Sequence, residues 1–216
     1  MIINDIVTGI IAIVIGYLLG SIPSAYIVTR LATGKDIRQM GGGNVGGLNV
    51  FREVGALPAM VVAIIDLSKG AAAIAIAYWL LDLPPTFVLL AGLAAVIGHN
   101  WMVWLKFSGG KGMGAAIGAM AVVMPLYGYW QGVVIFLGIV LVLLVITRNV
   151  ALSMGTALVF LPLITWLGTK SGTATVIAII LGLVVAIKFF PTARAAWAKT
   201  GTKKDFIFDR WQRGRR

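Results

Sequence analysis

Long apolar stretches, separated by short polar or glycine-rich turns, dominate the chain. Most are long enough to cross a hydrocarbon core of about 30 Å as α-helices rising about 1.5 Å per residue. The fourth is too short to span unaided, and we expect a half-helix that its neighbours bury. The stretches are Ile6–Leu31, Leu57–Leu81, Thr86–Leu105, Gly114–Met124, Trp130–Thr147, Ala151–Leu167 and Thr173–Phe190.

The composition points the same way. Of the 216 residues, 60% are apolar and 12% are charged, and the mean hydropathy is +0.99. Soluble domains carry about 25% charged residues. Residues 1–8 contain no Lys or Arg, so we interpret the first stretch as a retained helix rather than a signal peptide. We predict an all-α integral membrane protein of about seven transmembrane helices, with a polytopic membrane domain over residues 1–192 and a basic tail over residues 193–216.

The basic residues predict the topology. The net charge is +11, yet the charge lies in inter-helix loops and the C-terminal tail, which argues against a nucleic-acid partner. In a seven-span arrangement, 16 of the 18 lysines and arginines lie on one side of the membrane. The two exceptions are Lys69, which lies inside a helix, and Lys170. Because positive loops stay in the cytoplasm, we expect the N-terminus outside and the C-terminus and both glycine-rich loops in the cytoplasm. We expect the tail to lie against anionic head groups, with a solvated tail as the alternative.

Cysteine and histidine limit the available chemistry. The chain has no Cys and one His, so we expect neither disulfides nor a metal site, and we expect no cofactor.

The first glycine-rich loop is the strongest candidate for a binding site. Five of the twelve residues from Gly41 to Arg52 are glycine, and Asn44 and Asn49 add amide groups. Backbone N–H groups in such a loop form a nest that suits phosphate. Arg38 and Arg52 flank it with positive charge. The alternative is a flexible linker. The spacing of the glycines also fits a dinucleotide fingerprint, but no strand precedes it, so we reject that match.

Two ionisable residues lie inside the second apolar stretch. Asp66 and Lys69 are three residues apart, hence on one helix face. Ionisable residues within membrane helices usually pair and are functional by default. A buried ion pair that fixes helix register and a role at the site are both compatible with this spacing. In the first stretch, Gly16, Gly20 and Ser24 form a small-residue stripe that favours close helix packing.

A second glycine-rich basic loop follows the third stretch. His99 precedes it, and Gly109-Gly110-Lys111-Gly112 forms its centre. The match to a P-loop is loose, because Gly112 stands where Ser or Thr is required. Nothing in the spacing supports or excludes a general-base pair of His99 with Asp66.

Three blocks in this order resemble the bacterial acylphosphate-dependent glycerol-3-phosphate acyltransferases, the PlsY family. They are residues 36–52, the Asp66-Leu67-Ser68-Lys69-Gly70 segment and the segment from Gly98-His99 to Gly112, and Gly20-Ser21 and Ser24 match as well. The resemblance implies transfer of a fatty acyl group from acyl phosphate to the 1-hydroxyl of glycerol 3-phosphate, giving lysophosphatidate and phosphate. It implies phospholipid biosynthesis in a bacterial inner (plasma) membrane. The acyl chain would lie between helices, in lipid. The sequence does not define the oligomeric state.

The expected site combines this resemblance with the charges on the loops. Arg52 offers a bidentate fork for one phosphate and Lys111 a point charge for the other. We expect direct transfer without an acyl-enzyme. The expected catalytic residues are Arg52, Lys111 and His99, and the expected substrate-binding residues are Ser21, Arg38, Gly41, Gly42, Gly43, Asn44, Gly46, Asn49, Asp66, Lys69, Gly109, Gly110 and Gly112.

The chain departs from the family pattern at several positions. Gly42 and Leu48 replace a serine and a threonine of the first loop, Met102 a proline and Ser108 a lysine. Pro191-Thr192-Ala193-Arg194 replaces a segment of the His-Arg-x-Asn type. Two alternatives to the acyltransferase follow: a substrate-shifted or non-catalytic homologue that binds a phosphorylated head group, and an anion transporter. No inverted repeat is visible, which argues against the transporter.

Overall fold

The computed structural model describes residues 2–199, with side chains over residues 4–191 and at residue 194. In this part of the chain every regular element is a helix, and an isolated antiparallel bridge joins Met102 and Ser108. The chain forms two compact units, Met1–Leu126 and Tyr127–Arg216. The all-helical fold class is therefore confirmed.

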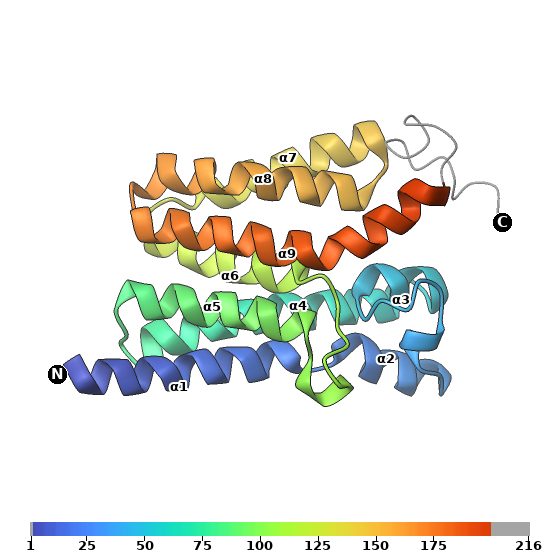
Figure 1. Ribbon diagram of the computed structural model, residues 1–216, viewed down its shortest axis with the longest axis horizontal. Coiled ribbons are helices and arrows are strands. Elements are labelled where there is room, and N and C mark those ends of the chain that lie inside the picture. Colours follow the sequence, from blue (N-terminus) through green and yellow to red (C-terminus); the bar gives the residue numbers. More distant parts are fainter. Residues whose placement is uncertain (1, 200–216) are drawn as a thin grey trace. The chain divides into compact units, whose positions relative to one another are not determined.

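The first unit contains four long helices that run side by side (Figure 1). They are α1 (Ile2–Ser21), α4 (Ala56–Ala75, continued by the π-helical turn η2, Ile76–Leu80), α5 (Pro85–Asn100) and α6 (Met113–Leu126). Shorter elements lie at one end of them: α2 (Ser24–Thr33), η1 (Ile37–Gln39), α3 (Gly47–Glu53) and η3 (Val103–Leu105).

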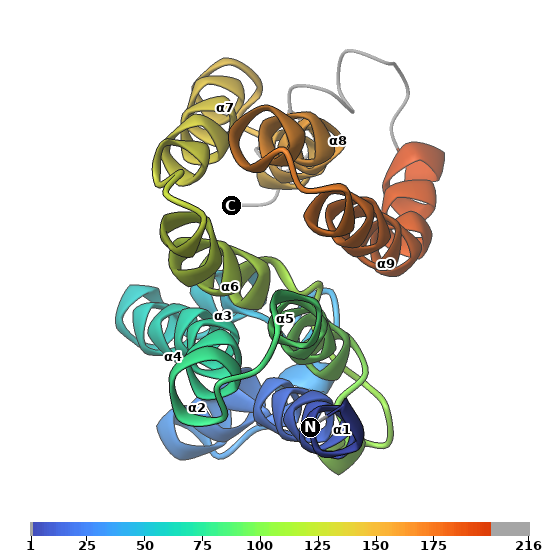
Figure 2. The ribbon, with the colours of Figure 1, turned by 90° about the vertical axis from the view of Figure 1, so that its left-hand side faces the viewer.

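Glycines bring two helix pairs of this unit into backbone contact. A Cβ at Gly16 or Gly20 of α1 would overlap backbone carbonyl groups of α5, and a Cβ at Gly98 of α5 would overlap the carbonyl of Tyr17. Gly70 of α4 and Gly118 of α6 face one another's helix backbones in the same way. Small residues allow this approach. The predicted packing stripe at Gly16 and Gly20 is confirmed, and Figure 2 shows these helices end-on.

Several predicted boundaries were wrong. The first stretch is broken after Ser21, because Pro23 has no N–H to continue the helix, and Ser24 begins α2. The third helix ends at Asn100, because the chain turns there into the bridge that closes at Ser108. The glycine-rich segment was expected to be a loop up to Arg52, but its second half is the helix α3.

The second unit consists of three helices. They are α7 (Gln131–Thr147), α8 (Val150–Thr169) and α9 (Gly172–Lys199), with α8 packed between α7 and α9 (Figure 2). The seventh helix was predicted to end at Phe190, but α9 continues through Pro191 to Lys199 and bends along its length (Figure 1). Most of the predicted basic tail, residues 200–216, lies outside the described residues.

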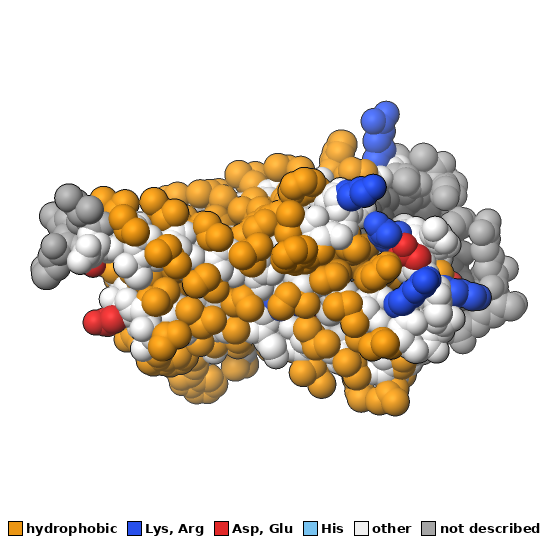
Figure 3. Space-filling view, turned by 90° about the horizontal axis from the view of Figure 1, so that it is seen from below, with side chains coloured by type: hydrophobic (Ala, Val, Ile, Leu, Met, Phe, Trp, Pro, Cys, Tyr) orange, Lys and Arg blue, Asp and Glu red, His pale blue; other side chains and the backbone are white. Residues whose placement is uncertain are grey.

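The described helices fit a membrane protein. Four candidate spans are long and apolar enough to cross a bilayer: Asn4–Thr33, Ala56–Leu80, Val150–Thr169 and Gly172–Pro191. Pro85–Asn100, Met113–Leu126 and Gln131–Thr147 are shorter apolar helices. On the face drawn in Figure 3, hydrophobic side chains cover the helices, and Lys and Arg side chains gather at one end.

Candidate active site

The first glycine-rich loop is held in one shape by the side chain of Asn49 in α3. Its Nδ2 donates hydrogen bonds to the backbone oxygens of Met40 (3.1 Å) and Asn44 (3.0 Å), and its Oδ1 accepts one from Gly42 N (3.3 Å). Asn49 is buried. The amide is therefore engaged within the loop, which argues against the flexible-linker alternative.

Glycine is required at some positions of this loop and not at others. Gly41 has a φ of +52°, and a Cβ there would lie 2.5 Å from a Glu53 carboxylate oxygen and 2.6 Å from Asn49 Oδ1. At Gly46, an added Cβ would lie 2.9 Å from the amide nitrogen of Asn44. At Gly42 the φ lies outside the left-handed region, and a Cβ would meet nothing within 4 Å.

The second glycine-rich loop folds back over the end of α5. Gly110 N donates a hydrogen bond to His99 O at 3.0 Å. A Cβ at Gly109 would overlap the backbone oxygens of His99 and Asn100, and a Cβ at Gly110 would overlap the His99 ring at Nε2. Only glycine allows the loop to lie this close to α5. The sequence Gly109-Gly110 is thus explained by packing as well as by phosphate chemistry.

The structure brings the two loops together. An added Cβ at Gly110 would lie 2.6 Å from the backbone oxygen of Val45, in the first loop. Val45 also packs in one buried apolar cluster with Met102 and Leu105, which precede the second loop. The two loops were predicted separately from the sequence, and the structure brings them into direct contact.

Two positive charges, those of Lys111 and Arg52, lie close to the contact between the two loops. Burial and, to a smaller extent, the positive charge of the nearby Arg52 together lower the pKa of Lys111 to about 8. Arg52 is exposed, and Lys111 is half-buried. Two cations this close together create a positive potential that favours the binding of a phosphate dianion.

A buried polar network lies behind the second loop. Lys69 Nζ donates to Asp66 Oδ1 (2.7 Å), to Ser24 Oγ (3.0 Å) and to the Ile22 backbone oxygen (2.6 Å). Ser24 Oγ donates to Asp66 Oδ1 at 2.6 Å. The predicted pairing of Asp66 with Lys69 is confirmed, and both side chains are almost fully buried. The network joins α4 to the break between α1 and α2.

His99 connects this network to the second loop. Its Nδ1 lies 3.5 Å from Asp66 Oδ1, within ion-pair range but without a hydrogen bond, and its Nε2 faces Gly110. His99 is buried. A chain of contacts therefore runs from Lys69 through Asp66 and His99 to the glycine beside Lys111.

The remaining predicted site residues lie near the loops in supporting positions. Ser21 is buried, and its Oγ donates to Gly98 O at 3.4 Å, which ties α1 to α5. Arg38 forms a bidentate pair with Asp36, with a shortest distance of 2.6 Å, and its guanidinium lies 5.4 Å from the Tyr26 ring centroid. These hydrogen bonds from Arg38 lower the pKa of the Asp36 carboxyl.

Several groups that shape the site were not predicted from the sequence. The Tyr17 hydroxyl donates to Trp101 O at 2.8 Å and fixes the start of the second loop. Glu53 lies against Gly41 and Asn100 against Gly112. Ser24 was recognised as part of a motif but not as the hydroxyl that joins Asp66 and Lys69. A lone Asn, Tyr or Glu beside a loop carries no pattern that would have identified it.

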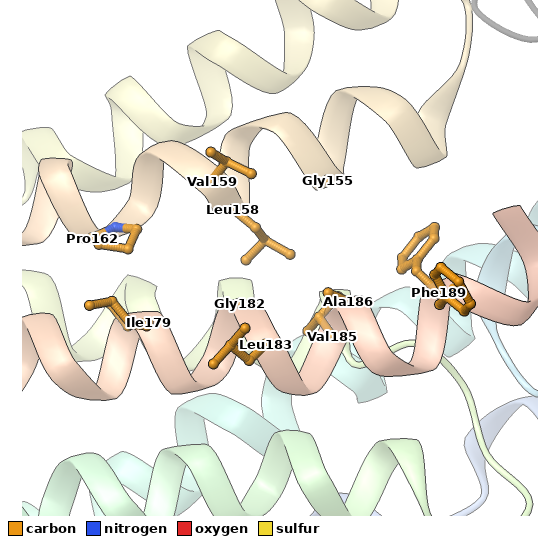
Figure 4. A pocket seen from close by; sticks show the side chains of 12 residues that line it. Gly155, Leu158, Val159, Pro162, Ile179, Gly182, Leu183, Val185, Ala186 and Phe189 are labelled. Carbon is orange, nitrogen blue, oxygen red and sulfur yellow. The ribbon is translucent and has the colours of Figure 1, made fainter.

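An apolar cavity of about 440 Å³ lies between α8 and α9, in the second unit (Figure 4). It contains no charged or polar side chain among its lining residues, so it is suited to hydrocarbon and not to phosphate. The lining residues are Gly155, Leu158, Val159, Pro162, Ala178, Ile179, Gly182, Leu183, Val185, Ala186, Phe189 and Phe190.

The fold is that of a helical membrane protein in which two glycine-rich loops lie in contact near two cations, Arg52 and Lys111. The sequence model of the family described as glycerol-3-phosphate acyltransferase matches residues 10–198. Glycerol-3-phosphate acyltransferase 1 of Dehalococcoides mccartyi is 50% identical over 202 residues, which cover 94% of this chain and 97% of that protein. Glycerol-3-phosphate acyltransferase of a Synechococcus species is 44% identical over 156 residues, covering 70% and 71%.

Solved structures agree with the sequence relatives. The crystal structure of PlsY (YgiH), an integral membrane glycerol 3-phosphate acyltransferase, in its glycerol 3-phosphate form has a TM-score of 0.80 and 27% sequence identity, and the match covers 88% of this chain and 92% of that chain. Its lysophosphatidic acid form has a TM-score of 0.78 at 25% identity. The chain belongs to the glycerol-3-phosphate acyltransferase family of the PlsY type. The predicted family, the membrane location and the acyltransferase class are confirmed.

Proposed function

We propose that this chain transfers a fatty acyl group from acyl phosphate to the 1-hydroxyl of glycerol 3-phosphate in a bacterial inner membrane. The single observation that carries the proposal is the contact of the two glycine-rich loops beside Arg52 and Lys111. Both proposed substrates carry a phosphate group. A surface with two cations and two glycine-rich stretches of backbone suits two phosphates better than one.

The proposed roles follow from the geometry. Arg52 holds one phosphate with its planar fork, and Lys111 holds the other as a point charge. Backbone N–H groups of residues 41–47 and 109–112 complete the two phosphate sites. Arg38 orders the first loop through Asp36, and Asn49 and Ser21 hold the supporting elements in place.

The chemistry is a direct displacement. The glycerol hydroxyl oxygen forms a bond to the acyl carbon, the bond from that carbon to the phosphate oxygen breaks, and inorganic phosphate leaves. A substrate phosphate accepts the hydroxyl proton. The positive charges stabilise the oxyanion that develops on the acyl group and the charge on the departing phosphate. Positioning supplies much of the rate because acyl phosphate is already activated.

The buried network has a positioning role in this proposal. Asp66 and Lys69 hold each other, and Asp66 faces His99, which lies under Gly110. The network fixes the position of the second loop relative to α4 and α5, and therefore the position of Lys111. In this proposal His99 supports the second loop beside the reacting phosphates, and it is not part of a Ser–His–Asp arrangement.

The proposed topology has seven spans, four of them long and three shorter. In this arrangement the exposed aromatic residues Trp79, Trp130 and Trp166 lie at the outer ends of their helices, where indole rings favour the membrane interface. Both loops and residues 193–216 are then cytoplasmic. This places the phosphate sites on the side where phosphorylated metabolites are made.

Reconstitution tests the proposed function. Purified protein in lipid vesicles is supplied with acyl phosphate and glycerol 3-phosphate, and released phosphate and lysophosphatidate are measured together. We expect equal amounts of both, dependent on both substrates. Turnover with an acyl thioester and none with acyl phosphate would contradict the proposed donor. Lys111→Ala serves as the site control and should lose most of the activity.

A further inference from the structure

Asn100, the last residue of α5, carries a buried amide that makes no hydrogen bond within the described part of the chain. The side chain is fully buried, and among the described residues neither Oδ1 nor Nδ2 makes a hydrogen bond. Most buried polar groups in proteins are paired, and an unpaired one calls for an explanation. The Asn side chain has two N–H donors and an oxygen acceptor, so more hydrogen-bonding groups are left unpaired here than at a single buried hydroxyl.

The idle amide lies against the loop that carries Lys111. A Cβ at Gly112 would lie 2.7 Å from Asn100 Oδ1 and 2.6 Å from a Val96 methyl group. Gly112 has a φ of +75°, and a Cβ at Gly109 would overlap the backbone oxygen of Asn100. Gly112 therefore lies against the Asn100 side chain, and Gly109 lies against the Asn100 backbone oxygen.

Some backbone groups of this loop are already engaged. Gly110 N donates to His99 O at 3.0 Å, and Gly112 O accepts from Ala116 N at 2.9 Å. Three of the four central residues are glycines, which adopt a wide range of backbone conformations. The loop backbone therefore offers the nearest candidate partners for the Asn100 amide.

We propose that Asn100 is a positioning residue for Lys111. When substrate phosphate binds, the peptide groups of residues 109–112 turn and hydrogen-bond to the Asn100 amide, which fixes Lys111 against the phosphate. The structure described here is then the open arrangement of the loop. This inference rests on the proposed role of Lys111 in phosphate binding.

The key variant is Asn100→Leu, which keeps the shape of the side chain and removes its polar atoms. In the open state this replaces an unpaired buried amide with an apolar group, which is neutral or stabilising. In the phosphate-bound state it removes the partner of the loop. Stability and activity should therefore move in opposite directions, which a merely structural role would not produce.

A matched control comes from the second unit. Thr165 in α8 is also buried, and its Oγ1 also has no hydrogen-bond partner among the described residues. Thr165→Val removes a comparable unpaired group from the compact unit that contains neither loop. It should leave the melting temperature equal or higher and leave the kinetics unchanged.

Loop movement can be followed with one thiol, because the natural chain has no Cys. Ser108 is exposed and lies next to Gly109. In the Ser108→Cys protein, the rate of maleimide labelling is measured with and without glycerol 3-phosphate. We expect the substrate to change the rate, Asn100→Leu to abolish that change, and Thr165→Val to retain it. We also expect kcat/KM for glycerol 3-phosphate to fall at least tenfold in Asn100→Leu, about 1.4 kcal/mol.

Each of the other outcomes overturns the inference. Asn100→Leu turnover within twofold of the parent, no effect of glycerol 3-phosphate on labelling of the parent, or a lower melting temperature in Asn100→Leu would each do so. If Asn100→Leu does not fold, Asn100→Ala takes the same labelling and kinetic measurements, and unchanged results there refute the role. Labelling needs no acyl donor, so a failure of acyl phosphate as donor is recognised separately, by absent phosphate release from the wild-type protein.

Discussion

The buried pair of Asp66 and Lys69 gives the most quantitative test of the scaffold behind the site. The perturbations are Lys69→Met, Asp66→Leu and the double variant, each of which keeps side-chain volume close to the original. Lys69→Met leaves the Asp66 charge buried with the Ser24 hydroxyl and with His99 at 3.5 Å. Removing one partner of a buried ion pair typically costs about 3–5 kcal/mol.

The double variant should cost much less than the sum of the single variants. Two independent losses would sum to roughly 6–10 kcal/mol. Replacing both ions by apolar groups removes the uncompensated charge, and the main remaining loss is the acceptor of the Ser24 hydroxyl, about 1–3 kcal/mol. The structure therefore predicts a coupling energy of at least about 3 kcal/mol between Asp66 and Lys69.

The assay is a double-mutant cycle from unfolding free energies measured in one detergent by denaturant titration. Ser68→Ala serves as a control, because Ser68 lies between the pair on the same helix but is exposed, and its hydroxyl donates to the backbone oxygen of Ile64. It should change the unfolding free energy by less than about 0.5 kcal/mol, as surface substitutions usually do. A double variant that loses the full sum of the two single losses would refute the coupling of Asp66 with Lys69.

Three further predictions concern the site and the topology. Because the pKa of Lys111 is lowered to about 8, its positive charge is present below pH 8 and lost above it. The value of kcat/KM for phosphorylated substrate should therefore fall as pH rises through 8. The variant Lys111→Arg should remove this fall while keeping part of the activity. Gly42→Ser fits sterically and adds a donor beside the proposed phosphate, so glycerol 3-phosphate should bind roughly tenfold to a hundredfold more tightly, with the larger gain when Leu48→Thr is added; unchanged affinity in both would place this part of the loop away from the phosphate. In intact cells, an impermeant thiol reagent should label Thr86→Cys and not Ser108→Cys, and labelling of Ser108→Cys would reverse the orientation.

The apolar pattern was sufficient to predict the long helices, and it was weakest at their ends. A run of apolar residues indicates burial, and apolar residues continue across the break at Pro23 and the turn after Asn100. The first and third helices were therefore predicted too long. The helix α3 was missed because glycine-rich sequence indicates a loop, whereas packing of Val50 in a shared apolar cluster stabilises this helix. Tertiary contact overrides local propensity in such a segment.

The site was predictable as far as chemistry-bearing residues occur in recognisable spacing. Asp66 and Lys69 could be paired because three residues on a helix place them on one face, and the glycine-rich loops suggested phosphate. That Gly110 lies against Val45 could not be predicted, since it depends on how α5 packs against α1. Asn100 carries no sequence signal, because the lack of a hydrogen-bond partner for its amide among the described residues depends on the packing of the second loop against α5.

The most direct test of the central claim is equilibrium binding of glycerol 3-phosphate by calorimetry. The wild-type protein is compared with the double variant Arg52→Ala/Lys111→Ala and with Lys35→Ala, which removes one exposed cation outside both loops. A hydrogen bond to a charged group contributes about 1.5–3 kcal/mol, so the double variant should bind at least roughly tenfold more weakly, while Lys35→Ala binds as the wild type does. A folded double variant with wild-type affinity would contradict the claim that the two loops form the phosphate site.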